Sequence, residues 1–479
     1  MSFNSIQFLI FFPIVVYFYF LISPQYRWLF LLLASCYFYM CFIPVYIFVL
    51  FSTIIIDYCA AIYIEKSHGT KRKFFLWASI ISTCLILFIF KYFNFFNMSL
   101  AAVAQRFHWD YSVDNLSLIL PIGLSFHTFQ SLSYVIEVYR GRQKAERHFG
   151  IYALYVMFFP QLVAGPIERP SHLLPQFYKT NHFEYSRVKR GLRLMLWGFF
   201  KKIVIADNLA VLVDKVYASP LDFHGGTLLL ATYFFAFQIY YDFSAYSDIA
   251  IGCARILGYE LMMNFRQPYL SSSISEFWKR WHISLSTWFR DYLYIPLGGN
   301  KVSEPRWVLN IGIVFIVSGL WHGANGTFII WGALHAFYYI AAKYLPRLFG
   351  NTQRRLLEQR LYPTLFKLAG VLITFNLTAL AWIFFRSKSF SDAKIVISKI
   401  STSTWLSDNL STIEPYAWSF LLWGALVFLT ETGMFLKRKH LLVFAASKKY
   451  LRWGFYYTVI LLIFILGNFN ERQFIYFQF

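Results

Sequence analysis

Histidines in apolar segments are the residues of this sequence best placed to carry out chemistry. His322 ends an apolar run in "SGLWHGA" (318–324), where Gly319 and Gly323 allow another backbone or a substrate to approach closely. The pKa of an imidazole lies near working pH and burial keeps the ring neutral, so His322 can serve as a general base. The alternative is a packing histidine bonded to a backbone carbonyl. These seven residues alone do not decide between the two roles.

Three other histidines lie in or beside apolar segments. His335, in "WGALHAFYY", follows His322 in the next apolar segment and either faces the same cavity or bonds across helices. His127, in "PIGLSFHTFQSLSY", is favoured as a structural residue. His282, in "KRWHISLS", is by its pattern alone an interfacial surface residue. The remaining histidines are expected in loops or at the edges of segments: His68, His108, His148, His172, His182, His224 and His440.

Carboxylates also occur within apolar segments. "QIYYDFSAYSDIAIG" (238–252) contains Asp242 and Asp248, whose spacing of six residues places them on different faces of a helix. They bracket a broken turn, pair with Arg255 or Arg266, or join a polar network that holds helices together. The isolated charges are interpreted as structural: Asp57, Lys91, Glu137 and Glu431.

These side chains lie on elements that must sit in a membrane. The chain has 479 residues, of which 58% are hydrophobic and 14% charged, with a mean hydropathy of +0.50, and this composition excludes a soluble protein. A membrane span needs about 20 apolar residues. We therefore predict an all-α polytopic membrane protein with 11 to 13 transmembrane or re-entrant helices in a single domain, 1–479. The predicted segments are 6–22, 28–44, 46–63, 74–95, 115–136, 149–165, 191–213, 227–257, 307–321, 327–345, 362–385, 416–436 and 453–469.

The net charge of +21 comes from short basic clusters between apolar segments. This is the pattern of cytoplasmic loops, whereas a nucleic-acid site needs a contiguous basic surface. Alternation of the clusters puts the N-terminus outside the cytoplasm and predicts that 149–165 dips into the membrane and returns. The clusters are 65–73, 139–148, 185–193, 346–360 and 437–442.

Residues 260–306 are too polar to span a membrane and too aromatic for a loose loop. Ser273 and Glu276 form a predicted capping box at the start of a helix. Trp278, Trp281, Leu285 and Trp288 then recur at helical spacing, which predicts one amphipathic helix along the cytoplasmic interface. The turn "PLGGN" (296–300) ends it.

Several common catalytic and metal-binding motifs are absent. The sequence has no Walker loop, H-E-x-x-H or G-x-S-x-G, which argues against an ATP-driven pump and a zinc protease. Its five cysteines show no metal-ligand spacing, and we expect no bound metal or cofactor. Buried Asp, Glu and His also suit a transporter working by alternating access, although no matching halves are visible. A non-catalytic scaffold of an envelope complex is a further alternative.

Five stretches together resemble the membrane-bound O-acyltransferases, in the branch that contains alginate O-acetyltransferase. They are "FFPQLVAGPIERP" (158–170), "QIYYDFSAYSDIAIG" (238–252), "NFRQPYLSSSISEFWKRWHISLSTWFRDYLYIPLGGN" (264–300), "SGLWHGANGTFIIWGALHAFY" (318–338) and "LAWIFFRSKSFSDA" (380–393). The resemblance implies a ring of helices around a central tunnel. It also implies that His322 matches the characteristic histidine of the family and His282 a second polar position. The branch that acts in D-alanylation of teichoic acids shares the "RWH" and "WHG" elements.

By this resemblance the protein moves acetyl groups from a cytoplasmic donor, acetyl-CoA, to hydroxyls of an extracytoplasmic polysaccharide such as alginate, another exopolysaccharide or peptidoglycan. The expected location is the bacterial cytoplasmic (inner) membrane, with an extracytoplasmic partner protein that completes transfer. D-alanyl transfer to teichoic acid is the alternative reaction. We assign His322 as the base and His282 as the residue that orients or polarises a reactant. Further candidates for binding donor or substrate are Trp278, Lys279, Arg280, Ser286, Trp288, Arg290, Asp291, Trp321, Asn325, His335 and Asp242.

Overall fold

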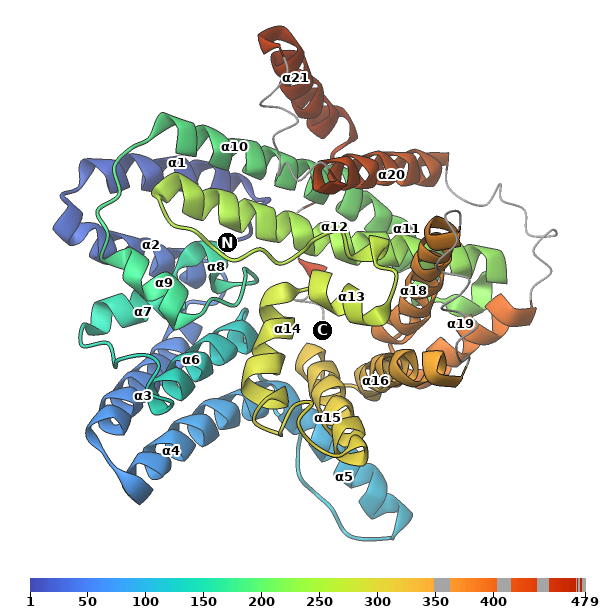
Figure 1. Ribbon diagram of the computed structural model, residues 1–479, viewed down its shortest axis with the longest axis horizontal. Coiled ribbons are helices and arrows are strands. Elements are labelled where there is room, and N and C mark those ends of the chain that lie inside the picture. Colours follow the sequence, from blue (N-terminus) through green and yellow to red (C-terminus); the bar gives the residue numbers. More distant parts are fainter. Residues whose placement is uncertain (349–361, 403–414, 437–447, 471, 473, 476–479) are drawn as a thin grey trace. The chain divides into compact units, whose positions relative to one another are not determined.

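The computed structural model describes residues 1–348, 362–402, 415–436, 448–470, 472 and 474–475. Within these residues the regular structure is entirely helical, with no strand (Figure 1). Most of the basic cluster 346–360 lies outside the described residues, as do cluster 437–442 and His440. The chain divides into two compact units, Met1–Met195 with Tyr246–Met262, and Leu196–Ala245 with Met263–Phe479.

The first unit is built from the predicted N-terminal segments. Within it α3 packs against α4 and α6, and α2 packs against α7. Its helices are α1 (Ile6–Leu21), α2 (Arg27–Met40), α3 (Tyr46–Lys66), α4 (Gly69–Leu87), α5 (Phe93–Arg106), α6 (Leu124–Tyr139), α7 (Phe149–Met157), α8 (Phe159–Leu162), α9 (Pro170–Phe177) and most of α10 (Tyr185–Phe199).

Two apolar segments of the first unit differ from simple spans. The predicted segment 115–136 becomes helical only at Leu124, because Gly123 turns the chain with φ +78° where a Cβ would collide with the carbonyl oxygen of Leu162. The segment 149–165 forms the nine-residue α7 and the short α8. At 1.5 Å per residue, α7 is too short to cross a bilayer. This agrees with the predicted dip.

The second unit carries both candidate catalytic histidines. Its elements are the π-helical turn η3 (Phe200–Ala206), α11 (Asp207–Ala218), the first part of α12 (Gly225–Leu257), α13 (Ile274–Arg280), α14 (Ile283–Phe289), the π-helical turn η6 (Arg290–Tyr294), α15 (Glu304–His322), α16 (Gly326–Leu348), α18 (Tyr362–Arg386), α19 (Phe390–Thr402), α20 (Pro415–Leu436) and α21 (Lys449–Leu466). Because α12 is unbroken, Asp242 and Asp248 do not bracket a turn.

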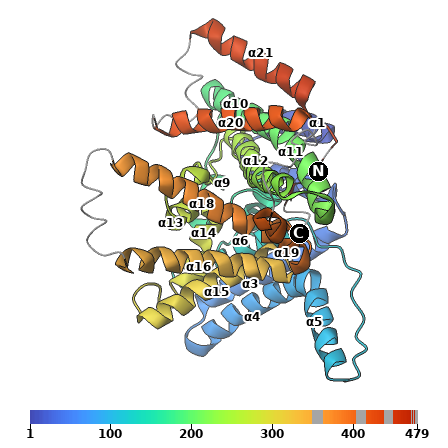
Figure 2. The ribbon, with the colours of Figure 1, turned by 90° about the vertical axis from the view of Figure 1, so that its right-hand side faces the viewer.

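Glycines bring α15 and α16 into close contact (Figure 2). A Cβ at Gly319 would overlap the carbonyl oxygen of Phe328, and one at Gly332 would overlap that of Phe315. Only glycine allows these two backbones to approach so closely. The predicted role of Gly319 is therefore confirmed, and it fixes the end of α15 that carries His322.

Five helical stretches of the described chain are long and apolar enough to cross a membrane: 46–66, 69–106, 326–345, 365–386 and 449–466. The protein is an all-α, multi-pass membrane protein. The count of 11 to 13 crossing or re-entrant helices, the central tunnel and the single domain 1–479 stay predictions.

Candidate active site

A break between two short helices positions His282. Ser273 caps α13 as predicted, since its hydroxyl accepts from the Glu276 amide at 3.2 Å. The prediction of one continuous amphipathic helix is wrong, because Trp281 is extended and His282 is left-handed, with φ 40° and ψ 57°. Figure 1 shows α13 and α14 running in different directions. A left-handed non-glycine residue costs about 1–3 kcal/mol and needs support from its surroundings.

Asn264 supplies that support. Its carbonyl oxygen accepts from the Ile283 amide at 2.9 Å, and its side-chain oxygen accepts from the Ser284 hydroxyl at 2.6 Å. The first turn of α14 is therefore tied to the non-helical segment before α13. No apolar periodicity marks Asn264, so sequence reasoning missed it.

His282 is fully buried rather than interfacial. Its ring lies 4.6 Å from the Phe243 ring and 6.0 Å from Trp321, measured between centroids. Burial lowers the pKa of His282 to about 3, so the imidazole is neutral at working pH. A neutral imidazole can orient or polarise a reactant without introducing a buried charge.

His322 is the last residue of α15 and is 4% exposed. Aromatic rings surround it: Trp321 at 4.9 Å, Trp331 at 5.0 Å and Phe385 at 5.2 Å between centroids. Trp321 therefore contacts both His322 and His282. Residues 40 positions apart in the sequence meet at one indole ring.

His335 belongs to the same aromatic cluster. Its ring lies 4.9 Å from Trp331, which also contacts His322, and 5.0 Å from Trp278. Neither ring nitrogen of His335 has a hydrogen-bond partner among the described residues. The prediction that it bonds across helices is not supported, whereas its placement near His322 is.

A pocket of about 400 Å³ adjoins this cluster. Ser318, one helical turn before His322, lines the pocket, and so do Lys279 and Arg290. Four of the predicted binding residues therefore line it, namely Trp278, Lys279, Ser286 and Arg290. The full lining is Ser275, Trp278, Lys279, Ile283, Leu285, Ser286, Thr287, Phe289, Arg290, Tyr294, Ile311, Val314, Phe315, Ser318 and Tyr339.

The three basic candidates differ in their surroundings. Arg280 donates to Glu276 at 2.5 Å and to the Gln267 carbonyl oxygen, so α13 itself holds it. Arg290 contacts Asp291 at 2.7 Å but keeps 59% of its side chain exposed. Lys279 and Arg290 line the pocket, whereas Arg280 does not.

The other predicted binding residues have structural contacts. Trp288 is buried against Phe289 and Tyr292. Asn325 caps α16 through the Thr327 amide at 3.1 Å and donates to the Lys388 carbonyl oxygen.

Asp242 joins a buried ionic cluster away from the pocket lining. Lys202 reaches Asp207 at 2.7 Å and Asp242 at 2.8 Å, and neighbouring Lys201 reaches Glu431 at 3.3 Å. Both lysines stand on η3, where the π-helical turn directs consecutive side chains inward. Two consecutive lysines inside the predicted apolar segment 191–213 are the sequence feature that could have indicated this cluster. Glu431 has the structural role assigned to it.

Metal binding has no candidate in the described residues, where no three His, Cys, Asp or Glu side chains group closely enough to hold an ion. The chemistry available at the site is that of two histidines in an apolar cage, next to a pocket with a cationic rim. Such a site suits proton transfer and acyl transfer to a hydroxyl.

Comparison with known proteins agrees with this chemistry. The membrane-bound O-acyltransferase family matches residues 147–375. The chain is 37% identical over 415 residues to a protein of Pseudomonas aeruginosa named probable alginate O-acetylase AlgI, covering 86% of this chain and 77% of that protein. It is 36% identical over 404 residues to the peptidoglycan O-acetyltransferase of Helicobacter pylori, covering 78% and 74% of the two chains.

A more distant relative is the teichoic acid D-alanyltransferase of Bacillus subtilis, at 26% identity over 340 residues, 68% of this chain and 82% of that protein. The three relatives share transfer of an acyl group as their named activity. The chain therefore belongs to the membrane-bound O-acyltransferase family and is an acyltransferase.

Proposed function

We propose that this protein transfers acetyl groups from acetyl-CoA in the cytoplasm to hydroxyl groups of an extracytoplasmic polysaccharide. The observation that carries the proposal is the contact of Trp321 with both His282 and His322, one helical turn from a pocket with a cationic rim. Two of the relatives above are named as O-acetylating enzymes, which supports acetyl rather than D-alanyl transfer.

His322 acts as the general base in this proposal. The acceptor hydroxyl oxygen attacks the thioester carbonyl carbon while its proton passes to the imidazole of His322. The carbon–sulfur bond then breaks, and the thiolate takes the proton back from the imidazolium. His282, held neutral by burial, orients the thioester or the hydroxyl. Aromatic walls exclude water, which would otherwise compete as the acyl acceptor.

The pocket beside α14 and α15 is the proposed donor site. Lys279 and Arg290 at its rim suit the phosphates of coenzyme A, because both cations pair strongly with phosphate oxygens. The apolar interior, formed by residues such as Phe315 and Ile311, suits the uncharged thioester arm. On α15 the lining extends from Ile311 to Ser318, one turn before His322.

The proposed location is the bacterial cytoplasmic membrane, with the N-terminus outside. An extracytoplasmic partner protein receives the acyl group or assists its transfer to the polymer. The whole chain, 1–479, forms one functional domain.

The test is acetyl content of purified surface polysaccharide and peptidoglycan, measured by mass spectrometry in cells with the wild-type chain, His322→Ala or His282→Ala. We expect loss of O-acetyl esters from one polymer in both variants at normal membrane levels of the protein. The exposed His224→Ala serves as a matched control and should leave acetylation unchanged. Full acetylation in both site variants, or loss of D-alanyl esters instead, would contradict the proposal.

A further inference from the structure

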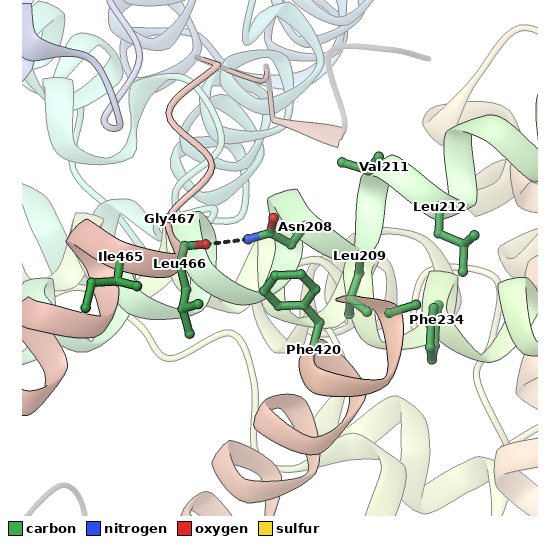
Figure 3. A pocket seen from close by; sticks show the side chains of 10 residues that line it. Asn208, Leu209, Val211, Leu212, Phe234, Phe420, Ile465, Leu466 and Gly467 are labelled. Carbon is green, nitrogen blue, oxygen red and sulfur yellow. Dashed lines mark hydrogen bonds between the residues drawn. The ribbon is translucent and has the colours of Figure 1, made fainter. Parts of the chain in front are cut away.

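The segment that follows α21 is held more firmly than α21 itself. Only 6% of the most apolar window of α21 is buried. Directly after it, the Asn468 amide donates to the Ile203 carbonyl oxygen at 3.0 Å, and Asn208 donates to that of Leu466 at 2.9 Å. Figure 3 shows this second bond in the wall of an apolar pocket of about 310 Å³. The C-terminal tail, meaning the described residues from Gly467 to Ile475, is thus fastened to η3 and α11.

Further contacts carry the tail to α12. Arg472 reaches one oxygen of Asp214 at 2.6 Å, and Arg386 reaches the other at 2.7 Å. Beyond it the Ile475 amide donates to Asp242 Oδ2 at 2.7 Å. Phe474 is 3% exposed. Ile475 is 2% exposed, so these two residues of the tail belong to the packed interior of the second unit.

Phe474 connects the tail to the candidate active site. Its ring lies 5.3 Å from the Phe243 ring, and Phe243 lies 4.6 Å from His282, in both cases at steep interplanar angles. Because Asp242 and Phe243 are consecutive in α12, one turn of this helix holds the tail by a carboxylate and supports His282 by a ring.

His282 needs such support on its side-chain face. Asn264 secures the backbone around it, but the imidazole itself is bounded by aromatic rings. Phe243 packs against the imidazole of His282, so a displaced Phe243 would change the packing on that side of the ring. Phe474 packs against Phe243, as Phe265 does at 5.1 Å, and both rings restrict its movement.

We infer that the C-terminal tail is a positioning element of the active site, which sets the orientation of His282 through Phe474 and Phe243 and is latched by Asp242. The inference rests on the proposed function. It also gives Asp242 a role in holding the tail rather than in contacting donor or acceptor. All three residues are positioning residues: Phe243 packs against His282, Phe474 packs against Phe243, and Asp242 holds the tail.

The kinetic test compares Phe474→Ala with Phe464→Ala, an equivalent truncation on α21 where the side chain is 73% exposed. Misplacing a reacting group by about 1 Å costs on the order of a hundredfold in rate, so we expect kcat for acetyl transfer to fall by about tenfold or more in Phe474→Ala. The KM for acetyl-CoA should stay near wild type. The thermal midpoint should fall because a buried ring is lost, so rates are compared at a temperature at which both chains are folded. Phe474→Leu should recover part of kcat, and Phe464→Ala should match the wild type. A wild-type kcat in Phe474→Ala overturns the inference.

A second measurement examines docking of the tail without reference to activity. Ile475→Cys is placed in a chain whose exposed Cys41, Cys59 and Cys84 are replaced by serine, and maleimide labelling is timed in native membranes. We expect slow labelling that becomes severalfold faster with Asp242→Asn. The neutral side chain accepts more weakly from the backbone amide of residue 475 and is no longer held by the charge of Lys202. Labelling as fast as that of Asn470→Cys, at an exposed position of the same tail outside α21, would show that residue 475 is not docked.

The two tests separate the inference from the proposed function. If His322→Ala abolishes acetyl transfer while Phe474→Ala has no effect on kcat, only the tail inference fails. If His322→Ala keeps full activity, the proposed function fails, and the labelling result still reports whether the tail is latched.

Discussion

The second unit contains two groups of buried titratable side chains with opposite surroundings. The histidine cluster, His282, His322 and His335, is enclosed by aromatic rings from Phe243, Trp321 and Trp331. The ionic cluster pairs Lys201 and Lys202 with the carboxylates Glu431, Asp207 and Asp242. Both groups lie in apolar segments, but of the two only the ionic cluster is neutralised by ion pairs.

The difference follows from what each side chain loses on leaving water. A lysine stays charged unless its environment is very apolar, so its burial requires a carboxylate partner. An imidazole loses its charge readily and tolerates an aromatic cage in the neutral form. The ionic cluster therefore serves to hold helices, whereas the histidine cluster keeps a proton acceptor available.

The largest effect should come from His322→Gln. We expect a fall in kcat of about 100- to 10,000-fold, the usual range for loss of a general base, because the amide cannot accept the proton. Membrane level and thermal midpoint should match the wild type. Turnover of radiolabelled acetyl-CoA by purified protein measures the change. A thermal midpoint that drops together with activity would assign His322 to packing.

Lys202→Ala should lower the stability of the protein, which His322→Gln leaves unchanged. It leaves Asp207 and Asp242 buried together without their cation, and breaking a buried pair in this way costs about 3–5 kcal/mol. We expect a lower thermal midpoint and less protein in the membrane. The second-site change Asp242→Asn should restore part of the stability by removing one unpaired charge. An unchanged midpoint in Lys202→Ala would show that the ionic cluster does not stabilise the fold.

Acidification should destabilise the protein through His282. In the unfolded chain this histidine binds a proton below about pH 6.5, whereas burial lowers its folded pKa to about 3. Between pH 7 and pH 5 the unfolded state is therefore favoured by about 2 kcal/mol from this group alone. His282→Gln should show a smaller fall in thermal midpoint over that range. His224→Gln, at an exposed position, should keep the wild-type fall; equal falls in all three chains would contradict burial of a neutral His282.

The smallest effect concerns the pocket rim. Lys279→Gln with Arg290→Gln should raise the KM for acetyl-CoA by about tenfold, as expected for two partly screened charge contacts with phosphate. Arg280→Gln is the matched control, because Arg280 is held by Glu276 and does not line the pocket. Initial rates over a range of acetyl-CoA concentrations measure both. An increase in KM with Arg280→Gln but not with the double variant would contradict the proposed donor site and favour one beside Arg280.

Sequence patterns anticipated much of this arrangement and failed where contacts are non-local. Apolar segments such as 227–257 and 327–345 agree with α12 and α16 within a few residues, because their length and hydropathy are local properties. The short α7 follows the expectation from charge alternation for 149–165. The repeat of Trp278, Trp281 and Leu285 predicted one helix, yet Asn264 captures the amides at the break and gives two.

In the candidate site, too, local features could be predicted from the sequence and non-local contacts could not. His322 and the glycines beside it could be singled out from one short stretch, because an imidazole in apolar sequence is costly and unusual. Sequence grouped Lys279 and Arg290 with Arg280, and only the hydrogen bonds of the Arg280 side chain to Gln267 and Glu276 separate them. Lys202 and Phe474 gave no local signal of their partners.

By itself, the sequence determined that this chain is a helical membrane protein with histidines placed where water is scarce, since apolar length and the cost of burying polar groups are readable residue by residue. The tertiary structure decided that Trp321 joins His282 to His322, that Lys202 neutralises Asp242, and that the C-terminal tail reaches Phe243. These contacts join residues tens to hundreds of positions apart, and packing rather than local propensity selects them.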